Sequence, residues 1–202
     1  MCLTKVRTSL HKAKFNAVSE RIKDVIATGE KVIVFTCFTD GIERHKKKLG
    51  DQAVTITGSD TSKQRMDAVD HFQSDPNVRV ILCNIIAGGV GITLTAGTHV
   101  IFQDLDWVPA NHAQAEDRCY RLGQDHRVTV EYFHAAGTLD GYMAELLERK
   151  MSLIATLTNP SSPNPVPTID CFLHHFTQLG FYVPLGIPHW SRLRTSECDI
   201  SR

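Results

Sequence analysis

The chain has 202 residues, which is enough for one main domain and a short appendage. It is 42% hydrophobic and 22% charged, as is ordinary for a soluble globular protein. The 22 basic residues balance the 22 acidic ones, so net charge indicates no polyanionic partner, and a nucleic-acid surface would have to be a local patch. No apolar run is long enough for a signal peptide or a membrane span, and we therefore expect a soluble intracellular protein without membrane contact.

The six cysteines are scattered, with no C-x-x-C pair and no zinc-type spacing. Cys37 and Cys83 lie inside apolar runs, where cysteine acts as a small hydrophobic residue, and this pattern favours a reducing compartment. Neither Cys83 nor Cys119 has the C-x5-R spacing of a cysteine phosphatase. The adjacent pair His174 and His175 is interpreted as incidental, because neighbouring side chains point apart and no carboxylate is nearby. We therefore predict no metal site.

The first half of the chain alternates between helical and strand-like patterns. Leu10–Thr28 carries apolar residues at helical spacing and is predicted to be an amphipathic helix. Lys31–Thr36 has the continuous apolar character of a strand that is buried on both faces. Thr39–Leu49 is predicted as a helix with a basic last turn, and Ala53–Thr57 as a second strand. Thr61 is followed three residues later by a glutamine, which predicts a capping box and a third helix.

The second half of the chain continues the same alternation. A third strand precedes a cluster of glycines, and a fourth strand precedes a helix that contains the sequence QAEDRCYRLGQ. A fifth strand and a closing helix complete the series. The three strands are predicted at Val78–Asn84, Thr98–Asp104 and Val128–His134, and the two helices at Gln114–Gln124 and Asp140–Leu157.

This alternation predicts an α/β fold with a parallel sheet of five to six strands, helices on both faces and right-handed crossovers. In such a sheet, ligands gather at the carboxyl ends of the strands. Residues 1–157 are predicted to form this domain. Four prolines within residues 159–167 then end the pattern. Residues 158–202 are a Pro-rich linker and tail, for which an appended element, a disordered segment and non-native sequence all stay open.

Glycines cluster after the third predicted strand, at Gly88, Gly89 and Gly91. Such glycines permit positive φ and let a phosphate approach backbone N–H groups, although a simple tight turn explains them equally well. The cluster is not a P-loop, because no GK[ST] sequence follows it. No Walker A motif occurs anywhere in the chain.

Three polar residues share one face of the predicted helix Gln114–Gln124, because Gln114, Arg118 and Arg121 stand at i, i+4 and i+7. Paired guanidinium groups at the functional edge of a sheet suit a triphosphate, since each forks onto phosphate oxygens. The alternative is that both arginines pair with acidic residues of the same segment. Spacing alone does not separate these two explanations.

Longer motifs favour the first explanation, contact with a triphosphate. The segment Gly88–Gln124 combines a glycine loop, an apolar strand, D-W-x-P and Q-A-x-D-R-x-x-R-x-G-Q. This pattern closely resembles motifs V and VI of the Swi/Snf-type ATPases, which are superfamily II DNA translocases. KVIVFTCFT looks like motif IV, and ITGSDTSKQR (residues 56–65) looks like the segment that follows it. Gly137 and Thr138, together with the closing helix, resemble the GT-x-(D/E) helix of the family. The resemblance covers about residues 10–157 and leans toward the annealing-helicase-like branch.

The resemblance implies that this chain is the second of two RecA-like lobes. In the family, the first lobe holds the Walker A lysine and the acidic residue that binds Mg²⁺. ATP and Mg²⁺ would therefore be held mainly by a lobe that this chain lacks. Arg118 and Arg121 would act across the cleft as catalytic arginine fingers. The residues of this chain implied to bind ATP are Gln114, Gly89, Gly91 and Asp117.

The resemblance also implies contacts to the backbone of double-stranded DNA, made by loops at the strand ends. Small hydroxyl groups and backbone amides can position phosphates without reading sequence. The candidates are Thr39, Ser59, Thr61, Arg65 and Gly88. For Ser59 and Thr61, helix capping is an equally good explanation, and Arg65 can instead pair with a nearby aspartate.

Two functional classes follow from the sequence. In the first, the chain is the C-terminal lobe of a DNA-dependent ATPase, inactive by itself and dependent on the N-terminal RecA-like lobe of the same enzyme. In the second, it is a non-catalytic module that binds DNA or a protein. We expect a monomer in isolation, located in a bacterial cytoplasm or nucleoid or in a eukaryotic nucleus. The chain departs from the family pattern at Thr93, Val108, His112 and Tyr120, which affects the contacts of the glycine loop and not the arginines.

Overall fold

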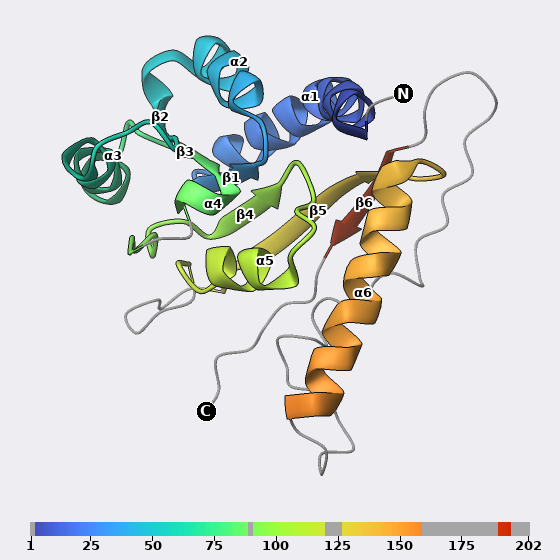
Figure 1. Ribbon diagram of the computed structural model, residues 1–202. Helices are drawn as coiled ribbons and strands as arrows, with labels where there is room; N and C mark the ends of the chain where they lie inside the picture. The colour runs from blue at the N-terminus through green and yellow to red at the C-terminus, as the bar shows by residue number, and fades with distance from the viewer. Residues whose placement is uncertain (1–2, 89–90, 120–126, 159–189, 195–202) are drawn as a thin grey trace.

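Six strands form one sheet in the computed structural model, which describes residues 3–88, 91–119, 127–158 and 190–194. Their order across the sheet is β2, β3, β1, β4, β5 and β6 (Figure 1). The strands are β1 (Val32–Thr36), β2 (Ala53–Ile56), β3 (Val80–Asn84), β4 (His99–Phe102), β5 (Thr129–Ala135) and β6 (Trp190–Arg194). Strands β1 to β5 pair in parallel, so the predicted parallel sheet is confirmed. Strand β6 comes from the segment predicted as the tail and pairs with β5 in the antiparallel sense.

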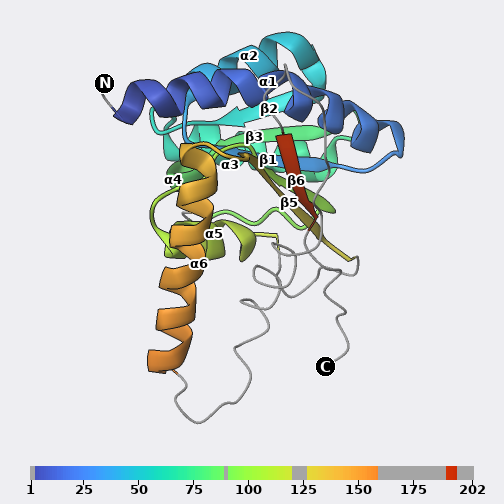
Figure 2. The same cartoon turned by 90° about the vertical axis from the view of Figure 1, so that its right-hand side faces the viewer.

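Helices cover both faces of this sheet (Figure 2). The helices are α1 (Leu3–Ala27), α2 (Thr39–Leu49), α3 (Ser62–Ser74), α4 (Ile85–Gly88), α5 (Pro109–Glu116) and α6 (Leu139–Thr158), with a 3-10 turn η1 at Gly50–Gln52. Apolar residues of α1 and α2 pack on one face, and those of α3, α5 and α6 pack on the other. The predicted three-layer α/β architecture is therefore confirmed.

The central strand β1 has apolar side chains on both faces of the sheet, so helices must pack on both. Val32 and Val34 belong to the core under α1 and α2, whereas Ile33 and Phe35 belong to the core under α3, α5 and α6. All four side chains are fully buried, as the continuous apolar run predicted. Because parallel pairing holds β1 in register with β3 and β4, the carboxyl ends of these strands meet at one edge of the sheet. We call this edge the carboxyl edge.

Two helices differ from their predicted bounds. Helix α1 begins at Leu3 rather than Leu10, because half-buried Val6 and Leu10 continue its apolar spacing toward the N-terminus. Helix α5 begins at a proline and ends at Glu116, so it covers only the start of the predicted helix Gln114–Gln124. Residues 120–126 lie outside the described part of the chain.

The backbone hydrogen bonds beyond Glu116 are those of a turn. The carbonyl oxygen of Arg118 accepts a hydrogen bond from the Leu94 amide at 2.9 Å, so it is engaged outside the helix. The amides of Arg118 and Cys119 bond three residues back, to Ala115 and Glu116, which is the tight pattern of a turn. Arg118 therefore does not share a helical face with Gln114, and this part of the sequence prediction is wrong.

Candidate functional site

A backbone hydrogen bond connects the segments that carry two of the predicted motifs. The glycine loop follows β3 and α4, and the turn that carries Arg118 follows α5. The amide of Leu94, three residues after the glycine loop, donates a hydrogen bond to the carbonyl of Arg118, 24 positions later in the sequence. Gly91 has a φ of 70°, the left-handed region that favours glycine. Gly89 lies outside the described residues, and Gly88 is the last residue of α4.

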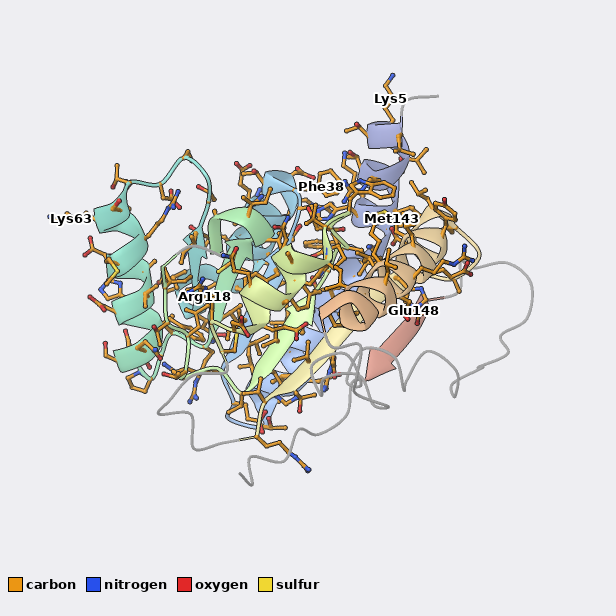
Figure 3. The ribbon with its side chains drawn as sticks, turned by 60° about the horizontal axis from the view of Figure 1, so that its bottom comes forward. Lys5, Phe38, Lys63, Arg118, Met143 and Glu148 are labelled. Atoms are coloured by element: carbon orange, nitrogen blue, oxygen red, sulfur yellow. The ribbon has the colours of Figure 1, made fainter. Side chains whose placement is uncertain are left out.

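The polar candidates of the α5 region differ in exposure. Gln114 and Asp117 are exposed, whereas Arg118 is half-buried and lies just beyond α5 (Figure 3). Arg121 is among the residues that the structure does not describe. The structure thus places one of the two predicted arginines, in the turn that bonds to Leu94. The roles assigned to these residues stay predictions.

The DNA-contact candidates lie around the start of α3 and of α2. Thr61 caps α3 with a complete capping box: its Oγ1 accepts from the Gln64 amide at 3.3 Å, and Gln64 Oε1 accepts from the Thr61 amide at 2.8 Å. The predicted capping box is therefore confirmed. Arg65 donates to the carbonyl of Gly58 at 3.4 Å. Ser59 and Thr61 are exposed, as is the DNA-contact candidate at the start of α2, Thr39.

A buried polar network lies behind the carboxyl edge, and sequence reasoning missed it. Its centre is Asp104, which follows β4 and is almost fully buried. The Asp104 carboxylate accepts hydrogen bonds from His11 Nδ1 at 2.8 Å, Thr36 Oγ1 at 2.6 Å and the Cys37 amide at 3.3 Å. The ammonium of Lys14 lies 3.4 Å from its other oxygen. One carboxylate thus joins α1 to the loops that follow β1 and β4.

Lys14 connects this network to α6. Its ammonium is 2.7 Å from Asp140 and donates to the carbonyl of Phe133 at 3.3 Å. Burial alone would raise the pKa of Asp104, but the charge of Lys14 and the hydrogen bonds from His11 and Thr36 outweigh it and lower the pKa to about 2. Asp104 therefore stays charged at neutral pH. The available sequence signal was a histidine and a lysine at i and i+3 on the apolar face of the first helix.

Two buried histidines extend the polar interior. His45 Nε2 lies 2.8 Å from Gln103 Oε1, and the Gln103 amide nitrogen lies 3.3 Å from the carbonyl of His11. Burial lowers the pKa of His45 to about 4, and it does the same for His112. Both rings are therefore neutral at neutral pH.

We expect acid to destabilise the lobe below pH 6.5, because the lowered pKa values of two buried histidines outweigh the raised pKa of one buried carboxyl, Glu116, which acts in the opposite direction. The folded pKa values of His45 and His112 lie below the ordinary 6.5, so below pH 6.5 the unfolded chain binds more protons than the folded one. Their contribution is complete above pH 6.5 and is lost as the pH falls toward 4. Urea unfolding at a series of pH values would check this. A free energy of unfolding that stays constant from pH 6.5 to 4 would contradict it.

An aromatic cluster packs α5 on the sheet. The ring of Phe102 stacks on that of Tyr132 with centroids 4.6 Å apart, and His112 lies 5.1 Å from Phe102. The hydroxyl of Tyr132 donates to the Glu116 carboxyl. Burial raises the pKa of Glu116 to about 7, even though this hydrogen bond acts in the opposite direction. The last residue of α5 is therefore anchored to β5 immediately before the arginine turn.

Within the described ranges, no group of three or more His, Cys, Asp or Glu residues is arranged to hold a metal ion. Over the same ranges, none of the helices has both the length and the apolar character needed to cross a membrane.

Comparisons with known proteins agree with this geometry. A model of the helicase conserved C-terminal domain matches residues 13–123. The chain is 37% identical over 155 residues to the DNA annealing helicase and endonuclease ZRANB3 of Bos taurus, a match that covers 73% of this chain and 14% of that protein. It is 33% identical over 156 residues to the ATP-dependent helicase ULS1 of Saccharomyces cerevisiae, which covers 75% of this chain and 10% of that protein. The chain thus spans only a small part of the length of these relatives.

One solved structure has a similar fold. The crystal structure of the C-terminal part of the Fun30 ATPase domain is similar with a TM-score of 0.61 and 26% identity, over 65% of this chain and 44% of that one. These relatives include an annealing helicase and other helicases, so the branch within the family stays a prediction. The family model covers more than half of the chain. The chain belongs to the helicase conserved C-terminal domain family and is a C-terminal RecA-like lobe of the Swi/Snf type.

Proposed function

We propose that this lobe works in an ATP-dependent translocase of double-stranded DNA, where it completes a nucleotide site built by the first lobe of the same enzyme. The observation that supports this most is the backbone hydrogen bond from Leu94, three residues after the glycine loop, to Arg118. It ties the turn that carries Arg118 to the stretch that follows the glycine loop. A guanidinium that starts from such a held turn loses little conformational freedom when it meets a phosphate.

Within this proposal, Arg118 and Arg121 neutralise the charge that develops on the transferred phosphoryl group. Gln114, Asp117 and the glycines of the loop line the nucleotide from this side. The first lobe would hold most of ATP and its Mg²⁺, which supplies charge neutralisation at the phosphates.

The DNA contacts of this lobe would be to backbone phosphates. Thr39, Ser59 and Thr61 are exposed beside the ends of β1 and β2, and Arg65 adds a cation next to them. Hydroxyl groups and a single guanidinium can hold phosphates in position without distinguishing bases. Because the relatives named above are eukaryotic proteins, we propose a nuclear location.

The alternative function, a non-catalytic module that binds DNA or a protein, has less support. The relatives that match most of this chain are named as helicases, one of them ATP-dependent. Joining this lobe to a first lobe distinguishes the two functions. Only the translocase function predicts that the joined protein gains ATPase activity.

The isolated 202-residue chain is expected to bind ATP weakly, if at all, and not to hydrolyse it, because its sequence has no Walker A lysine. It should bind double-stranded DNA regardless of sequence, with a Kd on the order of 10⁻⁴–10⁻⁶ M at physiological salt. Fluorescence anisotropy with two duplexes of unrelated sequence would measure this. The slope of log K against log salt reports the phosphates contacted, at about −0.9 for each.

The variant Arg65→Gln tests the proposed DNA surface. It should weaken binding to both duplexes equally and make the salt slope shallower by about 1. The variant Arg149→Gln is a matched control, since Arg149 lies on α6 and is highly exposed. Robust ATP hydrolysis by the purified chain, or binding to one duplex only, would contradict the proposed function.

A further inference from the structure

Two cationic side chains, one from the first helix of the lobe and one from α6, hydrogen-bond to the same short loop at the carboxyl edge. The loop is Leu105–Trp107, which follows β4 and carries the D-W pair of the family motif. Arg7 of α1 donates from Nη2 to the carbonyl of Leu105 at 2.7 Å. Lys150 of α6 donates from Nζ to the carbonyl of Trp107 at 2.7 Å. Both residues lie outside the segment 13–123 that the family model matches.

Arg7 also bridges to the loop that follows β1. Its guanidinium carbon lies 5.5 Å from the ring centroid of Phe38 and 5.6 Å from that of Trp107, within the range of cation–π contacts. Figure 3 shows Phe38 beside α1. A planar guanidinium can contact aromatic rings and still donate hydrogen bonds at its edge, which an ammonium cannot do in the same way. Arg7 thus links the loops after β1 and β4.

The clamped loop determines where α5 begins. Asp106 Oδ1 accepts from the Val108 amide at 2.8 Å and from Asn111 Nδ2 at 2.9 Å. The Asp106 amide donates to His112 Nε2 at 3.0 Å. The loop and the first turn of α5 are therefore one hydrogen-bonded unit. Because α5 carries Gln114 and leads directly to Arg118, a shift of the loop would be passed on to both.

We propose that Arg7 and Lys150 form a clamp that holds Leu105–Trp107 and so aligns α5 and the arginine turn. In this role they are positioning residues for Gln114 and Arg118, and the catalytic consequence rests on the proposed function. The two carbonyl groups that the clamp holds have left the β-ladder, so each needs a donor from elsewhere. Besides the clamp, the Leu105 carbonyl accepts only a weak hydrogen bond among the described contacts, from Cys37 Sγ at 3.7 Å. The clamp supplies charged donors, whose hydrogen bonds are stronger than those between neutral groups.

Hydrogen–deuterium exchange of the 202-residue chain tests the clamp without ATP, DNA or a first lobe. Arg7→Met and Lys150→Met should each speed exchange in residues 105–112 by about tenfold or more, as the loss of one hydrogen bond from a charged donor implies. Exchange in β1 and β3 should stay unchanged. Lys12→Met on α1 and Arg149→Met on α6 are matched controls, since both side chains are exposed.

A spectroscopic measurement separates alignment from general stability. In a Trp190→Phe background, Trp107 is the only tryptophan, and its quenching by acrylamide reports its exposure. Quenching should rise in Arg7→Met. In Arg7→Lys, which keeps the charge but loses the planar group, quenching should fall only part of the way back to the parent value. Unchanged quenching and exchange in the loop, or faster exchange in all strands alike, would overturn the clamp.

An enzyme that joins this lobe to its first lobe gives the catalytic readout. Arg7→Met should lower kcat of DNA-stimulated ATP hydrolysis by about tenfold to hundredfold with little change in KM for ATP, as expected of a small misplacement. If the exchange results hold but kcat does not change, the clamp exists without the catalytic consequence, and the positioning role is refuted. If Arg118 variants are also fully active, the proposed function fails, while the exchange result still decides the clamp.

Discussion

Replacement of Arg118 or Arg121 by alanine, in an enzyme that joins this lobe to its first lobe, is expected to lower kcat of DNA-stimulated ATP hydrolysis by about 10³–10⁵. The physical reason is that an arginine finger meets charge that develops only in the transition state. ATP affinity should fall much less, because the first lobe makes most contacts to the ground state. Steady-state kinetics of each purified variant, with and without double-stranded DNA, would measure both quantities.

Several variants make this result specific. Arg118→Lys should restore little activity, since an ammonium cannot reproduce the bidentate fork of a guanidinium. Gln114→Ala should have a milder effect, because the exposed Gln114 amide carries no charge that could stabilise the transition state. Arg149→Ala is the matched control on an exposed arginine. Thermal unfolding of each variant should match the parent enzyme. Arginine variants that keep the parent rate, or that lose activity only by unfolding, would show that these residues serve structural ion pairs instead.

Replacement of Lys14 by methionine is expected to lower the free energy of unfolding of the lobe by about 3–5 kcal/mol. Lys14 is fully buried between Asp104 at 3.4 Å and Asp140 at 2.7 Å. Methionine fills a similar volume but leaves two buried carboxylates without their shared cation. A domain of this size is stable by only about 5–15 kcal/mol, so the loss would be a large fraction of the total. Urea unfolding followed by circular dichroism would measure it.

Two further variants identify the cause of this loss. Lys12→Met, which changes an exposed lysine on the same helix, should stay within about 0.5 kcal/mol of the parent chain. The double variant Lys14→Met with Asp140→Asn should recover part of the loss, because it removes one of the uncompensated charges. A Lys14→Met chain as stable as the parent would mean that the network is not held by charge pairing.

The alternation of strands and helices was readable from the sequence because its signals are local. The apolar run of β1, the capping box at Thr61 and the glycine that ends α2 each act within a few residues. The family motifs added the identity of the lobe. The same local reading placed Arg118 on a helix, and there it failed: α5 ends at Glu116, and the amides of Arg118 and Cys119 bond only three residues back, in a turn.

The sequence by itself thus determined the layers, the parallel sheet and the edge at which the candidate site lies. Only the tertiary structure decided which polar residues meet behind that edge. His11 and Asp104 are 93 positions apart, and Arg7 and Leu105 are 98 apart. Pairings at such separations leave no periodic trace in the sequence, since each partner looks like an ordinary helix or loop residue. They become visible only when the sheet brings α1 and the end of β4 together, where burial makes each unpaired charge or carbonyl costly.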